Sequence, residues 1–217
     1  MKFDNTKTFI DFSTDDYYLS ESNNNIDLTT YLNIINKEEN IKSNINVDQI
    51  TIDYMVKQIV NKNVDHVKEL LELDKEQNKI INMIDNDGES LLHISIFFGS
   101  YELTRLFLKY GAGPNKRNDD GQTPVFRIIF SSNEKLIGLL LEYGAILNIQ
   151  DNDGNTPLHF AVLSKNYAII KSLLEYGVDP LVHNKNDLVS FDFAVSKVDN
   201  TIVYDKKVMD IFSEYIE

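Results

Sequence analysis

A period of 33 residues runs through this chain and limits what it can fold into. The glycine of an Asp-rich turn recurs at Gly88, Gly121 and Gly154. A Tyr-Gly pair ends the longer apolar stretch of each of the same three units, at residues 110–111, 143–144 and 176–177. Each unit holds one short and one longer apolar stretch with helical spacing, and neither would be stable as an isolated helix in water. Units of this size become stable by burying their apolar faces against one another, which predicts a solenoid.

The last complete unit shows how each helix is expected to begin and end. Asp151-Asn152-Asp153-Gly154 is a cluster of turn-forming residues. Thr156 can then cap a helix, and Pro157 suits its first turn, where a missing N–H costs nothing. Gly177 tolerates a positive φ and is expected to end the second helix. The unit is therefore a turn, a short helix and a longer helix.

Residues 156–161, Thr-Pro-Leu-His-Phe-Ala, carry a resemblance to a known family. Together with the 33-residue period, they resemble the Thr-Pro-Leu-His-x-Ala motif of the ankyrin repeat. The copies at 90–95 and 123–128 match it imperfectly, and Phe126 stands in place of the histidine. The resemblance implies an all-α ankyrin-repeat solenoid of helix–turn–helix units with degenerate terminal repeats.

The chain divides into an N-terminal segment and a repeat domain. Residues 1–50 are acidic and polar, and we predict that they are partly mobile, with a short helix over 27–36. The repeat domain is expected to span residues 51–217. Its units are a degenerate repeat at 51–84, three clearer repeats at 85–117, 118–150 and 151–183, and a degenerate C-terminal cap at 184–217.

The N-terminal segment supports two interpretations. It has the polar composition of a mobile tail. It also contains more apolar side chains than a plain linker needs, which instead favours a segment that docks on the solenoid or on a partner. These side chains are Phe3, Phe9, Ile10, Phe12, Tyr17 and Tyr18.

The charge of the chain bears on its partners. There are 34 acidic and 21 basic residues, which give a formal net charge of −13. Nucleic-acid backbones and anionic membrane surfaces carry charge of the same sign, so we expect neither as a partner. A protein with a basic surface would suit this charge. With no cysteine, no 18-residue apolar run and no apolar leader after Met1, we expect a soluble cytoplasmic protein.

No pattern of catalytic or metal-binding residues emerges. His93 and His159 lie two periods apart and would not converge on a metal; the family resemblance implies that each braces the junction between turn and helix. An EF-hand loop aligned on Gly88 would have Met83 at its first position and Ile94 at its last, and neither can ligate calcium. The chain also lacks a cysteine nucleophile and a Gly-x-Ser-x-Gly motif. We therefore expect no enzyme activity, no cofactor and no metal.

Two series of residues fall where the resemblance implies protein binding, at the turn tips and the concave side of the first helices. The acidic series is Asp87, Asp120 and Asp153, with Glu89 beside the first. Such acids also favour turns through their own hydrogen bonds, so a purely structural role is the alternative. The apolar series is Phe97, Phe130 and Leu163, with Phe98 beside the first. These side chains either belong to the core or form an exposed patch that marks an interface.

Two further features concern packing. Gly138 lies inside the second helix of the middle repeat, where it costs roughly 0.5–1 kcal/mol relative to alanine. A ladder of tyrosines at the same phase is expected to pack mainly at helix ends: Tyr110, Tyr143 and Tyr176.

We interpret the chain as a non-catalytic protein-binding module that recognises a protein partner through its turn tips and concave face. Two alternatives come from other functional classes. One is a dedicated inhibitor or immunity-type protein that blocks a basic toxin or enzyme. The other is a structural scaffold that binds through its N-terminal segment. The sequence leaves the oligomeric state open.

Overall fold

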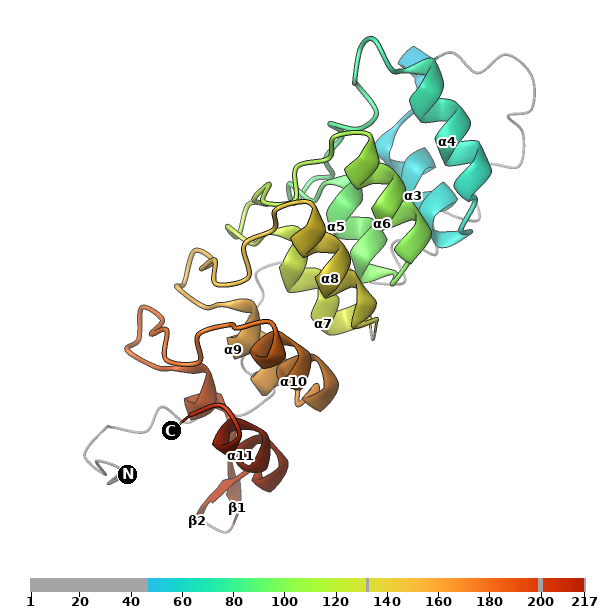
Figure 1. Ribbon diagram of the computed structural model, residues 1–217. Coiled ribbons are helices and arrows are strands. Elements are labelled where there is room, and N and C mark those ends of the chain that lie inside the picture. Colours follow the sequence, from blue (N-terminus) through green and yellow to red (C-terminus); the bar gives the residue numbers. More distant parts are fainter. Residues whose placement is uncertain (1–46, 132, 199–200, 217) are drawn as a thin grey trace.

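The computed structural model describes the chain from residue 47 to residue 216, except for residues 132, 199 and 200. Helices stack in pairs along one axis, and α3 (Ile52–Val60) and α4 (Val64–Leu73) form one end of the stack (Figure 1). A short 3-10 helix, η1 (Val47–Gln49), precedes α3. The predicted helix over 27–36 and most of the acidic segment over 1–50 lie outside the described residues.

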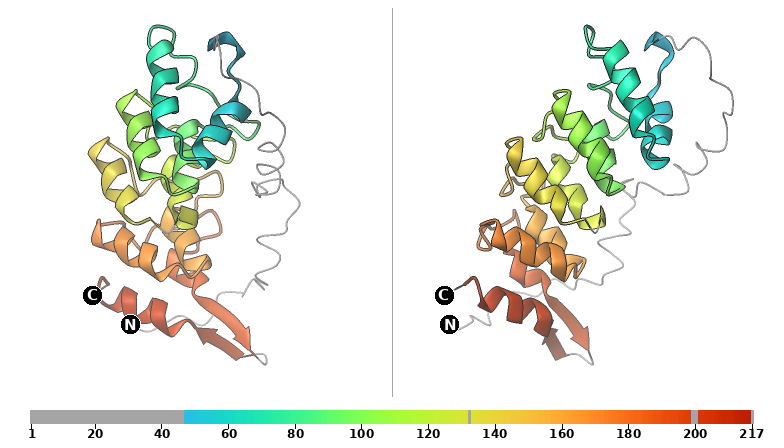
Figure 2. Two further views of the ribbon diagram at one scale, coloured as in Figure 1. Left: turned by 90° about the vertical axis from the view of Figure 1, so that its right-hand side faces the viewer. Right: turned by 45° about the vertical axis from the view of Figure 1, so that its right-hand side comes forward.

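Three further helix pairs follow, one in each of the clearer 33-residue units. They are α5 (Leu91–Phe97) with α6 (Tyr101–Lys109), α7 (Ile128–Ser131) with α8 (Lys135–Glu142), and α9 (Pro157–Leu163) with α10 (Tyr167–Glu175). A 3-10 helix, η2 (Pro124–Arg127), leads directly into α7. Figure 2 shows the first helices of the pairs in one layer and the second helices in the other. The predicted solenoid of helix pairs is confirmed.

The C-terminal end contains a β-hairpin that the sequence analysis did not predict. After the 3-10 helix η3 (Ser190–Phe193), strand β1 (Val195–Val198) pairs antiparallel with β2 (Thr201–Tyr204). The strands are rich in β-branched residues, which favour extended backbone over helix. Figure 2 shows the hairpin projecting beyond the last helices. Helix α11 (Lys206–Ser213) follows, and its buried Val208 and Phe212 close the apolar end of the stack, as expected for a cap.

The core runs along the stack between the two helix layers. Equivalent positions of successive repeats supply it with apolar side chains that are at most 1% exposed. The first helices contribute Met55, Leu92, Val125 and Leu158, and the second helices contribute Leu70, Phe107, Leu140 and Leu173. This regular burial explains why the apolar pattern repeats with the same period as the turns.

His93 and His159 each tie the start of a first helix to the next repeat. The Nδ1 atom of His159 lies 3.1 Å from the backbone nitrogen of Thr156 and 2.8 Å from its Oγ1 atom, and Nε2 lies 3.2 Å from the carbonyl oxygen of Leu188. His93 makes the same three contacts, with Ser90 and with the carbonyl of Gln122. A neutral imidazole that accepts at Nδ1 and donates from Nε2 satisfies this arrangement. The bracing role that the resemblance implied is therefore seen at both junctions.

Phe126 holds the equivalent position in the middle repeat and cannot form these bonds. Its buried ring lies edge-on to Phe160, with the ring centroids 5.7 Å apart. In the described part of the chain, the buried Oγ1 atom of Thr123 has no hydrogen-bond partner. The helix also opens here with the 3-10 turn η2, whereas α5 and α9 begin directly as α-helices. The missing imidazole accounts for the orphaned hydroxyl and is consistent with the irregular helix start.

The two capping threonines should therefore respond differently to the same substitution. Thr156→Val should destabilise the protein by about 1 kcal/mol, because the Nδ1 atom of His159 loses its bond with the Thr156 hydroxyl. Thr123→Val should be neutral or slightly stabilising, because it removes a buried hydroxyl that bonds to nothing. Urea unfolding midpoints of the two variants measure the contrast. Equal losses at both positions would contradict this assignment of the hydroxyls.

Two of the three tyrosines that follow the second helices, Tyr110 and Tyr176, contact the preceding repeat. The Tyr110 hydroxyl donates to Glu72 in α4. The Tyr176 hydroxyl lies over Gly138 in α8, 3.0 Å from the place where a Cβ atom would stand. Tyr110 and Tyr176 therefore pack at helix ends, while Tyr143 and Tyr176 remain 40% and 50% exposed. The close neighbour of Gly138 is a side chain and not a backbone.

Gly138→Ala should stabilise α8 by up to about 1 kcal/mol, through higher helix propensity and a less flexible unfolded chain. The new methyl group must displace the Tyr176 hydroxyl slightly, so the gain should be larger in a Tyr176→Phe background. Urea melts of the four proteins in this double-mutant cycle measure both effects. A loss of stability in both backgrounds would mean that something other than this hydroxyl excludes a side chain at residue 138.

Candidate functional site

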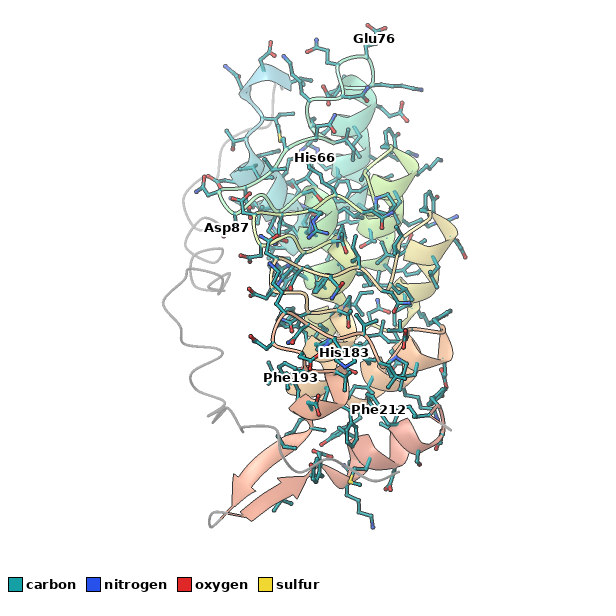
Figure 3. The ribbon with its side chains drawn as sticks, turned by 90° about the vertical axis from the view of Figure 1, so that its left-hand side faces the viewer. His66, Glu76, Asp87, His183, Phe193 and Phe212 are labelled. Atoms are coloured by element: carbon teal, nitrogen blue, oxygen red, sulfur yellow. The ribbon has the colours of Figure 1, made fainter. Side chains whose placement is uncertain are left out.

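Backbone hydrogen bonds join consecutive turns tip to tip. In each case an N–H of one turn donates to the C=O of the acidic residue in the preceding turn, with N···O distances of 2.8 to 3.1 Å. The three pairs are Asp119 with Asp87, Asn152 with Asp120, and Lys185 with Asp153. Figure 3 shows Asp87 on the side of the stack where these loops face the viewer. The predicted acidic series therefore lies on one continuous row, which we call the turn row.

The first residue of each turn closes that turn. The Oδ1 atom of Asp151 accepts hydrogen bonds from the N–H groups of Asp153 and Asn155, at 2.9 and 2.8 Å. Asp85 and Asn184 each accept two N–H bonds in the same way, and Asn118 accepts one. Closing the turn is the structural role that the sequence analysis considered for Asp87, Asp120 and Asp153. In the structure, the first residue of each turn performs it instead. The side chains of Asp87, Asp120 and Asp153 sit two residues further on.

The acidic series concentrates negative charge along the turn row. Asp153 is exposed, whereas Asp87 and Asp120 are half-buried. Burial raises the pKa of Asp87, and the charges of Glu89, Asp120 and Asp119 raise it further. Each of these effects disfavours the ionised carboxylate of Asp87. A cation placed against the turn row would stabilise the ionised form.

Glu89 was expected on the binding surface, and that prediction is wrong. Its side chain is fully buried and pairs with Arg127 from the next repeat, whose Nε and Nη2 atoms both donate to it. Asn118 donates a further hydrogen bond of 2.5 Å to Oε1. These partners hold the pKa of Glu89 below its usual value against the effect of burial. Glu89 therefore joins two repeats and offers nothing to a partner.

The burial of Glu89 is part of a regular pattern. The residue after each turn glycine bonds to the first residue of the next turn. Glu89 contacts Asn118 in this way, the Gln122 side chain bonds to Asp151, and Asn155 Oδ1 accepts from Asn184 Nδ2 at 2.8 Å. A polar residue at the same phase in three repeats was the sequence signal for this role.

The apolar series divides into three neighbouring aromatic residues, of which Phe130 is exposed, and the aliphatic Leu163. Phe130 is 47% exposed, and Phe97 is half-buried with its ring centroid 5.6 Å from that of Phe130. Phe98 stands edge-on to Phe97 at 5.2 Å and also packs against the core. Leu163 is half-buried against the core one repeat further on. We call Phe97, Phe98 and Phe130 the aromatic patch; Leu163 extends its line.

Sequence reasoning did not assign Phe160 to the surface. It is half-buried at the variable position of the first-helix motif, beside Phe126. Arg127 occupies the same variable position one repeat earlier, but its bond to Glu89 keeps it buried. Position alone therefore does not decide whether such a residue faces solvent.

The described residues also bear on metal binding and on membrane crossing. No group of three or more His, Cys, Asp or Glu side chains among them could hold a metal ion. Within the same residues, no helix is both long and apolar enough to cross a membrane.

The buried histidines make stability depend on pH. Burial lowers the pKa of His93 from 6.5 to about 4, against the opposing effect of Glu89, while Arg127 and Lys116 lower it further. Burial also lowers the pKa of His159. Because the unfolded histidine binds its proton at higher pH, its contribution is fully present above pH 6.5 and is lost as the pH falls towards 4.

We expect the free energy of unfolding to fall between pH 7 and pH 5, with His93 alone contributing about 2 kcal/mol of that loss. His93→Gln should lower stability at pH 7 but should show a smaller further loss at pH 5. Urea melts of both proteins at the two pH values provide the test. An identical pH dependence in the variant would show that His93 does not titrate in this way.

Comparison with known proteins agrees with this architecture. Residues 99–184 match a family model described as ankyrin repeats (3 copies), which covers the chain from the start of α6 to the turn after α10. A search of curated proteins found no match. The matched region contains α6, the helix pairs α7–α8 and α9–α10, and the turns that carry Asp120 and Asp153. The match over residues 99–184 supports an ankyrin-repeat protein.

Proposed function

We propose that this protein binds a protein partner with a basic surface, using the aromatic patch as its anchor and the turn row to attract that partner. Ankyrin repeats indicate a protein-interaction module. The finer assignment rests mainly on one observation, the pair of adjacent phenylalanines of which Phe130 is 47% exposed.

The aromatic patch has the properties of an interface anchor. Desolvating a large aromatic side chain at the centre of an interface can contribute roughly 2 kcal/mol or more to binding. Phe97 and Phe130 come from adjacent first helices, so one partner group can cover both rings. Because Phe130 retains nearly half its exposure, it contributes less to folding than the roughly 3–5 kcal/mol typical of a core phenylalanine.

The turn row would act at longer range. Exposed ion pairs are worth about 0–1 kcal/mol each, so these acids add little to affinity one by one. Together they provide a line of negative charge that speeds encounter with a basic surface, within a Debye length of about 8 Å at physiological salt. Asp87 gives a local reason to expect a basic partner. Burial and like charges raise its pKa, and a nearby cation would counteract both effects by stabilising the ionised carboxylate.

The test begins with a partner captured from the native host and compares two exposed aromatics. Phe130→Ala should raise the Kd roughly 30-fold, mainly through a faster off-rate, because it removes a desolvated anchor. Tyr143→Ala is the matched control: Tyr143 is 40% exposed but belongs to the second-helix layer, so binding should not change. A large loss of stability in Phe130→Ala, measured by urea melting, would instead assign this ring to the core.

The acidic part of the proposal has its own variant. Replacing Asp87, Asp120 and Asp153 with asparagine removes charge and leaves the turn-closing residues in place. We expect a slower on-rate and a weaker dependence of that rate on salt, with the off-rate nearly unchanged. An on-rate that is indifferent to both salt and these substitutions would remove the turn row from the proposal. An activity assay of the captured partner would then separate a simple binding module from a dedicated inhibitor.

A further inference from the structure

The aromatic patch lies in the same helix layer through which the described chain enters the stack. The first helix of the stack, α3, packs beside α5, and α5 and α7 carry the patch. Directly before α3, Val47 packs against the core and Ile50 is buried. Figure 2 shows η1 on the α3 side of the stack. The described chain therefore begins in the layer that bears the aromatic patch.

The sequence of the residues before the described chain is suited to an aromatic surface. Phe, Trp and Tyr make up 11% of the whole chain. The first 18 residues alone include five aromatic side chains: Phe3, Phe9, Phe12, Tyr17 and Tyr18. Ring–ring contacts contribute about 0.5–1.5 kcal/mol beyond the area they bury, so several such rings can hold a segment on a surface. Four acids stand among them, Asp4, Asp11, Asp15 and Asp16.

Charge favours the patch over the turn row as the place where this acidic segment would dock. The acids of the turn row repel it. The patch lies at the opposite end of the first helices, which for a seven-residue helix is roughly 10 Å away and beyond the Debye length of about 8 Å. The loops at that end carry the exposed Lys62 after α3 and Lys165 after α9, and the loop after α7 carries the exposed Glu134 next to the exposed Lys135. Lys165 Nζ lies 3.9 Å from Asp205 Oδ2 and its side chain remains 51% exposed.

The connecting chain is long enough for the segment to reach the patch. Residues 19–46 leave 28 residues between the last of these aromatics and the start of the described chain. A flexible chain of that length spans about 30 Å, and neighbouring helices pack about 8–10 Å apart, so α5 and α7 lie within reach of α3. A tether of this kind gives an effective concentration of the order of millimolar or somewhat less, so even weak contacts would populate the docked state.

We infer that residues 9–18 of this chain dock on the aromatic patch formed by Phe97, Phe98 and Phe130, and that they cover it in the absence of a partner. A protein partner that uses the same rings must then displace the segment, which makes the N-terminal residues an internal competitor. The docking itself does not depend on the proposed function; only the competition does.

A distance measurement on the full chain tests the docking without any partner. The chain has no cysteine, so Ser13→Cys and Lys135→Cys introduce two spin-label sites, one in the segment and one exposed position after α7. Pulsed electron paramagnetic resonance should give a narrow, short distance peak. Phe97→Ser combined with Phe130→Ser should abolish that peak and leave a broad distribution. Tyr143→Ser, an exposed aromatic of the other layer, should leave the peak unchanged.

Two outcomes would overturn the inference. One is a broad distribution that is the same with and without the aromatic patch, with circular dichroism confirming that every variant is folded. The other is a short peak that disappears when the doubly labelled protein is diluted with unlabelled protein, since the segment would then come from a second copy. A persistent intramolecular peak combined with unchanged partner binding in Phe130→Ala would retain the docking and reject the proposed function.

Discussion

Hydrogen bonds between successive turns determine how the repeats are positioned along this solenoid. Apolar packing between helices is strong but tolerates sliding, because it has no direction. The bond from Asp119 to the carbonyl of Asp87 allows one register only, and the same bond recurs at the next two junctions. Buried side chains such as Glu89 and His93 add directed contacts between the same repeats. The bonds along the turn row therefore fix the register in which the helices of successive repeats pack.

The period of 33 residues made the stack predictable because it reports which residues meet the same surroundings. The period could not predict that Glu89 is buried. Its partner, Arg127, lies 38 residues away in the sequence and contacts Glu89 only when the two repeats have stacked. The period also missed the hairpin at 195–204. There the terminal repeat has no following repeat to pack against, and the local preference of its β-branched residues for extended backbone prevails.

The positions of the residues in the proposed binding surface were predictable from the sequence, but their exposure and roles were less so. The 33-residue period predicted that Phe97 and Phe130 lie side by side, as they do in the structure. The exposed fraction of each ring depends instead on whether a neighbouring element covers it. The turn acids likewise fell on one row. Asp151 and Asp153 are residues of the same type and are equally suited to a turn. Hydrogen-bond geometry distinguishes them, because the side chain of Asp151 closes the turn and that of Asp153 does not.

The replacement of histidine by Phe126 divides the stack into two kinds of junction. The repeats that carry Phe97 and Phe130 are locked together by His93 and by the buried pair of Glu89 and Arg127. The following junction keeps the turn bond from Asn152 to Asp120 but has a ring contact in place of the imidazole bond, and apolar contacts are less directional than hydrogen bonds. A change in the curvature of the solenoid would therefore concentrate behind the aromatic patch, and the two phenylalanines would move as one rigid body.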